Sequence, residues 1–165
     1  MSVERLWAGW RSSYIETIGV VPRPDGCLFG GLLALADDEA LILERAEYSF
    51  TVMNAYPYTS GHVMVAPIRH VASITELGAD EGAALMHAIQ RATAVVDAVY
   101  HPEGINIGAN IGRAAGAGVP GHVHIHVLPR WNGDTNFMTS VAEARVLPES
   151  LRYSYEKLLT DWPTY

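Results

Sequence analysis

The sequence has little cysteine, no long apolar run and no cluster of basic residues. Its 165 residues contain one cysteine, Cys27, which excludes an internal disulfide and suits a reducing compartment. No stretch reaches the roughly 20 apolar residues that a membrane span needs. The first residues also lack the basic-then-apolar pattern of a secretory signal. We therefore expect a cytoplasmic protein that does not bind to a membrane.

The charge balance is acidic, with 18 Asp and Glu against 11 Lys and Arg and a formal net charge of −7. The basic residues are not gathered along one element, whereas binding to a nucleic acid polymer requires a basic face. We therefore expect no nucleic acid polymer as a partner. A small phosphorylated ligand is still compatible with this charge, because backbone amides, one or two arginines and imidazoles can hold it.

The chain shows no internal repeat, low-complexity tract or linker that would divide it. A length of 165 residues with 49% hydrophobic content suits one domain with a proper core. We expect a single domain over 1–165, made of an N-terminal head (1–26), a core (27–137) and a C-terminal helical tail (138–165).

Hydrophobic patterns predict five strands and two main helices. The strands are expected near 41–45, 47–53, 62–67, 104–107 and 122–128. Apolar residues at helical spacing predict one long helix between the third and fourth strands, at Leu85, Ile89, Ala92, Val96 and Val99. The same spacing after Pro148 predicts a C-terminal helix, at Leu151, Tyr155, Leu158 and Leu159. Such an order indicates an α+β domain with an antiparallel sheet of about five strands.

Residues 122–126 read His-Val-His-Ile-His, and this is the most informative motif of the chain. Alternate residues of a strand lie on one face, roughly 6.5–7 Å apart at each step of two. We therefore expect His122, His124 and His126 on one side and the apolar residues between them on the other. Imidazole is partly neutral and partly protonated near neutral pH. A row of three can act as nucleophile, base and acid, or it can hold a metal.

A glycine-rich loop precedes the histidines, with Asn110 and Arg113 among its glycines. Glycine lets backbone N–H groups approach a ligand and adopt the positive φ of an anion-binding nest. Asn110 could donate to a phosphoryl oxygen and Arg113 could pair with one. Residues 116–121 also match the Gly-x-Gly-x-x-Gly dinucleotide fingerprint, but that motif must lead from a strand into a helix. Because it leads into a strand here, we reject a Rossmann fold.

The three histidines are open to three interpretations. They could be solvated on an outer sheet face, hold zinc with an open fourth position, or work as a nucleophilic site in which His124 attacks. Metal-binding histidines usually bond to a carboxylate or carbonyl, and the spacing of Asp134 and Glu103 does not guarantee one. The adjacent glycine-rich loop favours phosphorus as the electrophile.

The sequence His-Val-His-Ile-His-Val-Leu at 122–128 resembles the signature of the histidine triad (HIT) superfamily of nucleotide hydrolases and transferases. Residues 54–67 resemble its first characteristic strand, and residues 110–118 resemble its phosphate loop. With 6–11 and 130–137, the similarity covers most of the chain. It is greatest to the branch that contains the diadenosine tetraphosphate phosphorylases.

The resemblance implies an HIT-like fold, a homodimer, and cleavage of the phosphoanhydride of a dinucleoside polyphosphate or related nucleotide. It implies that His124 takes the α-phosphoryl group as a nucleotidyl-histidine, while His122 and His126 orient it and contact phosphate. His62 matches a fourth histidine beside the triad. The implied substrate-binding residues are Asn54, His62, Asn110, Gly116 and Gly118. No cofactor is obligatory, although a divalent metal could accompany the nucleotide.

The sequence departs from the family pattern in two places. Some relatives carry Cys-x-x-Cys near the start as part of a zinc site, but here Gly30 follows Cys27, so we expect that zinc site to be absent. Gly118 stands where relatives often place Gln or Ser, which leaves open whether phosphate or water is the acceptor. Two alternatives stay open: a nucleotide-binding sensor with little turnover, and a zinc-binding module that uses the three histidines.

Four other residues are assigned less specific roles. We expect His70 in a loop or on the surface, where ligand contacts are common, and His87 exposed on the long helix. Trp131 and Tyr56 could stack on a base or belong to the core.

Overall fold

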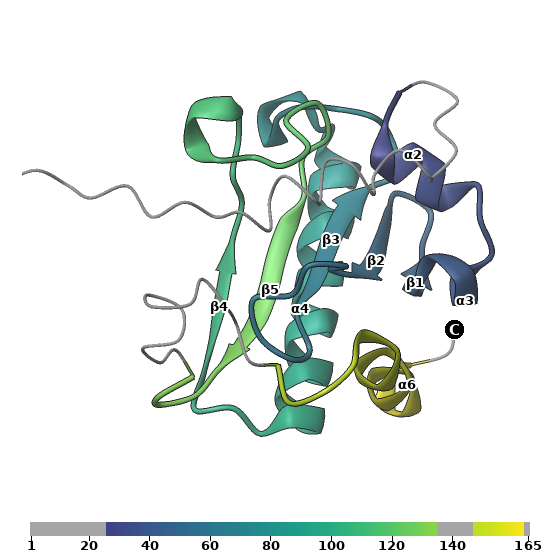
Figure 1. The fold of residues 1–165 in the computed structure, drawn as a ribbon. Coiled ribbons are helices and arrows are strands. Elements are labelled where there is room, and N and C mark those ends of the chain that lie inside the picture. Colours follow the sequence, from purple (N-terminus) through teal and green to yellow (C-terminus); the bar gives the residue numbers. More distant parts are fainter. Residues whose placement is uncertain (1–25, 135–146, 164–165) are drawn as a thin grey trace, which may run out of the picture.

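The computed structural model describes residues 26–134 and 147–163 (Figure 1). Residues 1–25 of the expected N-terminal head, 135–137 of the expected core, and 138–146 and 164–165 of the expected C-terminal tail lie outside these residues. The division of 1–165 into head, core and tail therefore stays a prediction.

An antiparallel sheet of five strands in the order β1-β2-β3-β5-β4 forms the centre of the fold (Figure 1). Each strand lies within two residues of its predicted start, except the last in the chain. The strands are β1 (Ile42–Arg45), β2 (Ser49–Met53), β3 (Val63–Pro67), β4 (Gly104–Gly108) and β5 (Ile125–Arg130). The predicted α+β class with an antiparallel sheet is confirmed.

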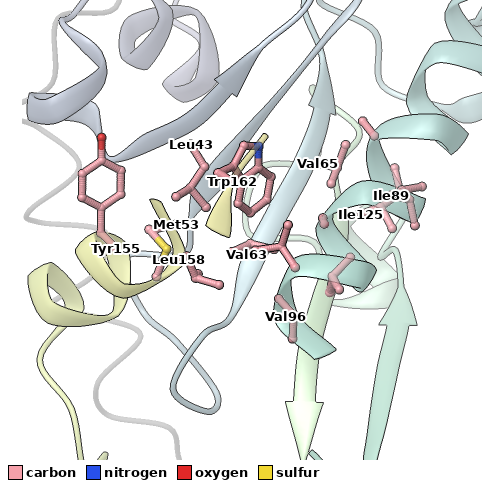
Figure 2. Packing of buried hydrophobic residues seen from close by; sticks show 14 of the residues in the cluster. Leu43, Met53, Val63, Val65, Ile89, Val96, Ile125, Tyr155, Leu158 and Trp162 are labelled. Atoms are coloured by element: carbon pink, nitrogen blue, oxygen red, sulfur yellow. The ribbon is translucent and has the colours of Figure 1, made fainter. Parts of the chain in front are cut away.

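Two helices cover one face of the sheet. The long helix α4 (Ala79–Tyr100) packs on β2, β3 and β5, and α6 (Leu151–Asp161) packs on α4 and β1. Figure 2 shows Ile89 and Val96 of α4 and Leu158 of α6 around Val63 and Ile125 of the sheet. Because the apolar side chains of both helices recur at helical spacing, each helix buries one stripe against these strands.

The opposite face is covered by the short helix α2 (Leu28–Leu33). There Phe29 packs with Phe50, Val52, Met64 and Ala66, which alternate with the residues that face α4. All five residues of β3 are buried as a result, because both faces of this strand are covered. Three further short elements complete the described chain: α3 (Asp37–Ala40), η2 (Ile74–Glu76) and η3 (Arg113–Ala115).

The strand β5 begins at Ile125 and not at His122, so only His126 of the triad lies within it. The pairing of β3 with β5 matches Val63 to Val127 and Val65 to Ile125. If this register continued, Ala66 would face His124 and Pro67, which has no N–H group to donate, would face Val123. The ladder ends before this position, and residues 122–124 lie outside the strand.

Within residues 26–134 and 147–163, no helix is long and apolar enough to cross a bilayer. The long helix α4 ends at Tyr100, and the next residue, His101, adopts a left-handed conformation with φ of 44°.

Candidate active site

A pocket that opens to solvent lies on the α2 side of the sheet. The start of α2, the turn after β2, the glycine-rich loop and the chain around the triad all contribute to it. All but one of the substrate-binding residues implied by the resemblance line it together with two histidines of the triad: Asn54, Asn110, Gly116, Gly118, His124 and His126. Its other walls come from Leu28, Phe29, Tyr56, Tyr58, Met64 and Val119. The fold thus gathers residues that lie up to about a hundred positions apart in the sequence into one cavity.

His124 is held in one orientation by the backbone of its own segment. Its Nδ1 atom lies 2.9 Å from the carbonyl oxygen of His122. Because a carbonyl can only accept, Nδ1 carries the proton and Nε2 carries the lone pair. The ring is 4% exposed and lies 5.1 Å from the ring of Phe29 and 5.0 Å from that of His126. This arrangement presents a neutral imidazole with a defined nucleophilic nitrogen at the pocket.

A chain of hydrogen bonds fixes the tautomer of His126. The backbone N–H of Tyr58 donates to Nδ1 of His62 at 3.0 Å, so the proton of His62 is on Nε2. That proton is donated to Nδ1 of His126 at 2.9 Å. A neutral His126 then carries its own proton on Nε2, as a donor for a ligand in the pocket. His62 is fully buried, lies behind His126 and does not line the pocket.

The glycine-rich loop adopts backbone conformations that require glycine at two positions. Gly112 has φ of 81° and Gly116 has φ of 85°, values that side chains with a Cβ rarely adopt. Asn110, Gly116 and Gly118 reach the pocket from this loop, whereas Arg113 is exposed and is not among the lining residues. The loop is thus shaped to bring backbone close to a ligand beside His124.

The family model of the HIT domain matches residues 36–133, which is more than half of the chain. The chain belongs to the HIT family. It is 37% identical to the AP-4-A phosphorylase of Mycobacterium tuberculosis, over 97% of this chain and 85% of the relative. It is 38% identical to the bis(5'-adenosyl)-triphosphatase of Dictyostelium discoideum, over 54% of this chain and 59% of that one. The resemblance to the HIT superfamily and to its diadenosine tetraphosphate branch is confirmed.

Solved structures of HIT proteins have the same fold. A zinc-bound histidine triad family protein from Mycobacterium smegmatis superimposes with a TM-score of 0.66 at 28% identity, over 82% of this chain and 91% of that one. The predicted HIT-like architecture is therefore confirmed.

His122 of this HIT protein lies apart from the other two triad histidines. It is 1% exposed, is not among the residues that line the pocket, and donates from Nε2 to the carbonyl oxygen of Pro67 at 2.8 Å. Its ring packs against Phe29 and against His70, at centroid distances of 5.1 and 5.2 Å. The predicted single row of three imidazoles is thus broken, because the chain leaves the ladder before His124. A contact between the His122 side chain and phosphate stays a prediction without support from this geometry.

Cys27, His70 and His122 form a cluster that the sequence patterns did not reveal. One atom of each side chain that could bind a metal lies within 4.8 Å of the other two such atoms. No other such group of three occurs among the described residues. The three triad imidazoles do not form one, so the geometry gives no support to zinc held by the triad. A structural zinc site takes four ligands, and the cluster offers three, with glycine at position 30. The cluster therefore does not complete such a site within the described part of the chain.

Burial lowers the pKa values of the triad histidines. Removal from water lowers the pKa of His124 below its ordinary value of 6.5. Burial, together with repulsion from the charge that His124 can carry, lowers the pKa of His126 to about 4. Burial also lowers the pKa of His122, opposed by its hydrogen bond to Pro67. All three rings are therefore neutral at neutral pH, as a histidine nucleophile needs.

The remaining sequence candidates fall on either side of the pocket. Tyr56 lines the pocket and is in place to contact a base. Trp131 instead packs edge-on against Tyr100 at 6.2 Å, beside a different cavity. His87 is exposed on α4, as expected. Sequence reasoning missed Phe29 and Tyr58, because an aromatic residue in a short helix or a turn has no periodic pattern to mark it.

Proposed function

We propose that this protein is a nucleotidyl transferase or hydrolase that cleaves the phosphoanhydride of a dinucleoside polyphosphate, such as diadenosine tetraphosphate. The proposal depends on the geometry of His124. Its Nδ1 atom is bonded to a carbonyl, which leaves Nε2 as the nucleophile in a pocket bordered by the glycine-rich loop. Two relatives act, by their names, on adenosine polyphosphates, which supports the same substrate class here.

The reaction follows two displacements at the same phosphorus atom. Nε2 of His124 attacks the α-phosphorus, a P–N bond forms, and the P–O bond to the rest of the polyphosphate breaks. The Nε2–H group of His126 donates to phosphoryl or leaving oxygens as they gain charge. An acceptor oxygen then attacks the same phosphorus, the P–N bond breaks, and His124 returns to its neutral form.

Asn54 is suited to contact ribose hydroxyls, because its carbonyl oxygen is fixed by the backbone N–H of Tyr56 at 3.0 Å and it lines the pocket. Asn110 and the backbone around Gly116 and Gly118 are suited to contact phosphate. We propose that the reaction needs no resident metal, since these groups and His126 meet the charge. A divalent metal could still arrive with the nucleotide.

Inorganic phosphate is the proposed acceptor, ahead of water. The relative named as a phosphorylase aligns over nearly the whole chain, whereas the triphosphatase aligns over about half. Gly118 has no side chain to occupy the space beside the leaving group, and it lines the pocket together with His124. An incoming phosphate can use this space.

Product analysis tests the function directly. With diadenosine tetraphosphate and ³²P-labelled phosphate we expect ATP and labelled ADP in equal amounts. ATP with AMP would instead establish water as the acceptor. No product with binding retained would establish the sensor, and neither binding nor product would overturn the nucleotide assignment. The protein should be purified without a polyhistidine tag, so that metal content can be measured on the same sample.

We also propose a homodimer that pairs along β4. This strand is at the edge of the sheet, and Ile107 on it is 51% exposed. No described strand pairs with the outer side of β4, and an edge with an exposed apolar side chain favours pairing with a second chain. Sedimentation equilibrium should give twice the mass of one chain, and a single-chain mass would contradict the proposal.

We propose a cytoplasmic location as well. The buried thiol of Cys27 supports it, because thiols stay reduced in the cytoplasm.

The pH dependence of kcat/KM should reflect the lowered pKa of His124. Only the neutral ring can attack, and burial keeps it neutral below its ordinary pKa of 6.5. We therefore expect the acid limb of the profile to have its midpoint below pH 6.5, and a midpoint at or above that value would contradict the prediction.

The stability of the fold should depend on pH for the same reason. In the unfolded chain His124 and His126 become protonated near pH 6.5, whereas in the folded chain they stay neutral, so the free energy of unfolding declines as pH falls below that value. Circular dichroism at each pH is the control for unfolding.

A further inference from the structure

His122 connects the thiol of Cys27 to the ring of His124, and a third hydrogen bond, to Pro67, anchors the His122 ring. The Sγ atom of Cys27 lies 3.2 Å from Nδ1 of His122. Nε2 of His122 lies 2.8 Å from the carbonyl oxygen of Pro67, and the carbonyl oxygen of His122 lies 2.9 Å from Nδ1 of His124. Cys27 is 4% exposed and His122 is 1% exposed. Both ring nitrogens of His122 are thus bonded to protein atoms away from solvent.

The direction of each bond follows from its partners. The Pro67 carbonyl has no hydrogen, so the proton of His122 is on Nε2 and Nδ1 has a lone pair. The thiol must then donate to Nδ1, because it alone of the two atoms carries a hydrogen. A ring bonded at both nitrogens can neither rotate nor change tautomer without breaking a buried hydrogen bond, which is costly.

The chain at 122–124 needs such a constraint because it lies outside the strand ladder. The backbone N–H of Val123 donates to the carbonyl of Val71 at 2.7 Å, and β5 begins only at Ile125. The position of the His122 carbonyl decides where the ring of His124 points. Cys27 stands at the start of α2, whose Phe29 packs against both His122 and His124 at 5.1 Å. One end of α2 thus contacts the nucleophile and its support.

We propose that Cys27 is a positioning residue: its thiol fixes His122, and through the His122 carbonyl it aims Nε2 of His124 at the pocket. This inference rests on the proposed function of His124. It also explains why the Cys27–His70–His122 cluster has only three ligands. The hydrogen bond between Cys27 and His122 fixes the His122 ring, which is the task that a four-ligand zinc site would otherwise perform there.

Three variants of Cys27 separate the hydrogen bond from packing. Cys27→Val keeps apolar volume but removes the donor, Cys27→Ala removes both, and Cys27→Ser keeps a donor at slightly shorter reach. We expect Val and Ala to lower kcat by about tenfold, the usual effect of one lost buried hydrogen bond, with KM changed by less than about twofold. Serine should recover most of this loss. Equal kcat in the valine variant and the parent protein would overturn the proposal.

A spectroscopic readout tests this clamp of Cys27 on His122 without relying on turnover. In ¹⁵N-labelled protein, His122 should be a single Nε2–H tautomer with a slowly exchanging proton, and the serine variant should keep this signal. The valine variant should show a mixture of tautomers or fast exchange. An unchanged His122 signal in the valine variant would overturn the clamp even if the protein has no activity. Stoichiometric zinc in untagged protein, lost in Cys27→Ser, would replace the clamp by a metal site.

Discussion

Replacing His124 by alanine is expected to lower turnover by at least about a thousandfold, the scale of loss for a nucleophile. Among the residues that the structure describes, His124 is the pocket-lining ring whose Nδ1 proton is bonded to a backbone carbonyl, which leaves the Nε2 lone pair for attack. Neither His126, whose Nε2 carries a proton, nor His122, which is bonded at both nitrogens, can take over this role. The initial rate with diadenosine tetraphosphate and phosphate is the measurement.

The fold should survive this substitution because the His124 ring makes one hydrogen bond, to its own segment. The matched control is His87→Ala, the same change at an exposed position of α4, which should leave the rate within about twofold since exposed sites tolerate substitution. Near-normal turnover in the His124 variant would remove the nucleophile assignment. Brief reaction with a labelled nucleotide should also give an acid-labile adduct on His124, and label on another residue would redirect the mechanism.

Much of the fold was predictable because strand alternation and helical spacing directly reflect which side of each element is buried. The strands at 42–45, 49–53, 63–67 and 104–108 and the helix α4 all lie where apolar periodicity places them. The order of blocks around the triad also predicted that Asn54, Asn110 and His124 share a site, and the structure places them around one pocket.

The details around His122 were not predictable in the same way. Alternation predicts one face for all three imidazoles, but it holds only while the ladder continues, and the pairing with β3 stops at Ile125. His122 then turns into a buried environment made by Cys27 and His70, which are 95 and 52 residues away in sequence. Such contacts depend on the path of α2 and of the chain after β3. No periodic signal in the sequence encodes that path.

Gly61→Ala should be the most destabilising small substitution near the site. Gly61 has φ of 76°, and a Cβ there would lie 2.5 Å from Cε2 and 2.9 Å from Cδ2 of Tyr100. The ring cannot move aside freely, because its hydroxyl donates to Glu149 at 2.9 Å and Nζ of Lys157 lies 4.2 Å from its centroid. A left-handed alanine costs about 1–2 kcal/mol and an overpacked core about 1–3 kcal/mol more. We expect the free energy of unfolding to fall by about 2–5 kcal/mol, a large part of a typical domain's stability.

Chemical denaturation of two further variants isolates the cause of this loss. Gly82→Ala adds the same methyl group inside α4, where nothing lies within 4 Å of the new Cβ, and should stabilise by about 0.5–1 kcal/mol. Tyr100→Leu combined with Gly61→Ala should relieve the clash and so recover that part of the lost unfolding free energy, but not the part due to the left-handed backbone. Since His62 follows Gly61 and donates to His126, the single variant should also lower kcat. Neutral surface changes alter the unfolding free energy by less than about 0.5 kcal/mol. If the Gly61→Ala variant stayed within that range of the parent protein, the prediction would be wrong. The Tyr100 ring would then move aside, and its contact with Gly61 would not hold His62 in place.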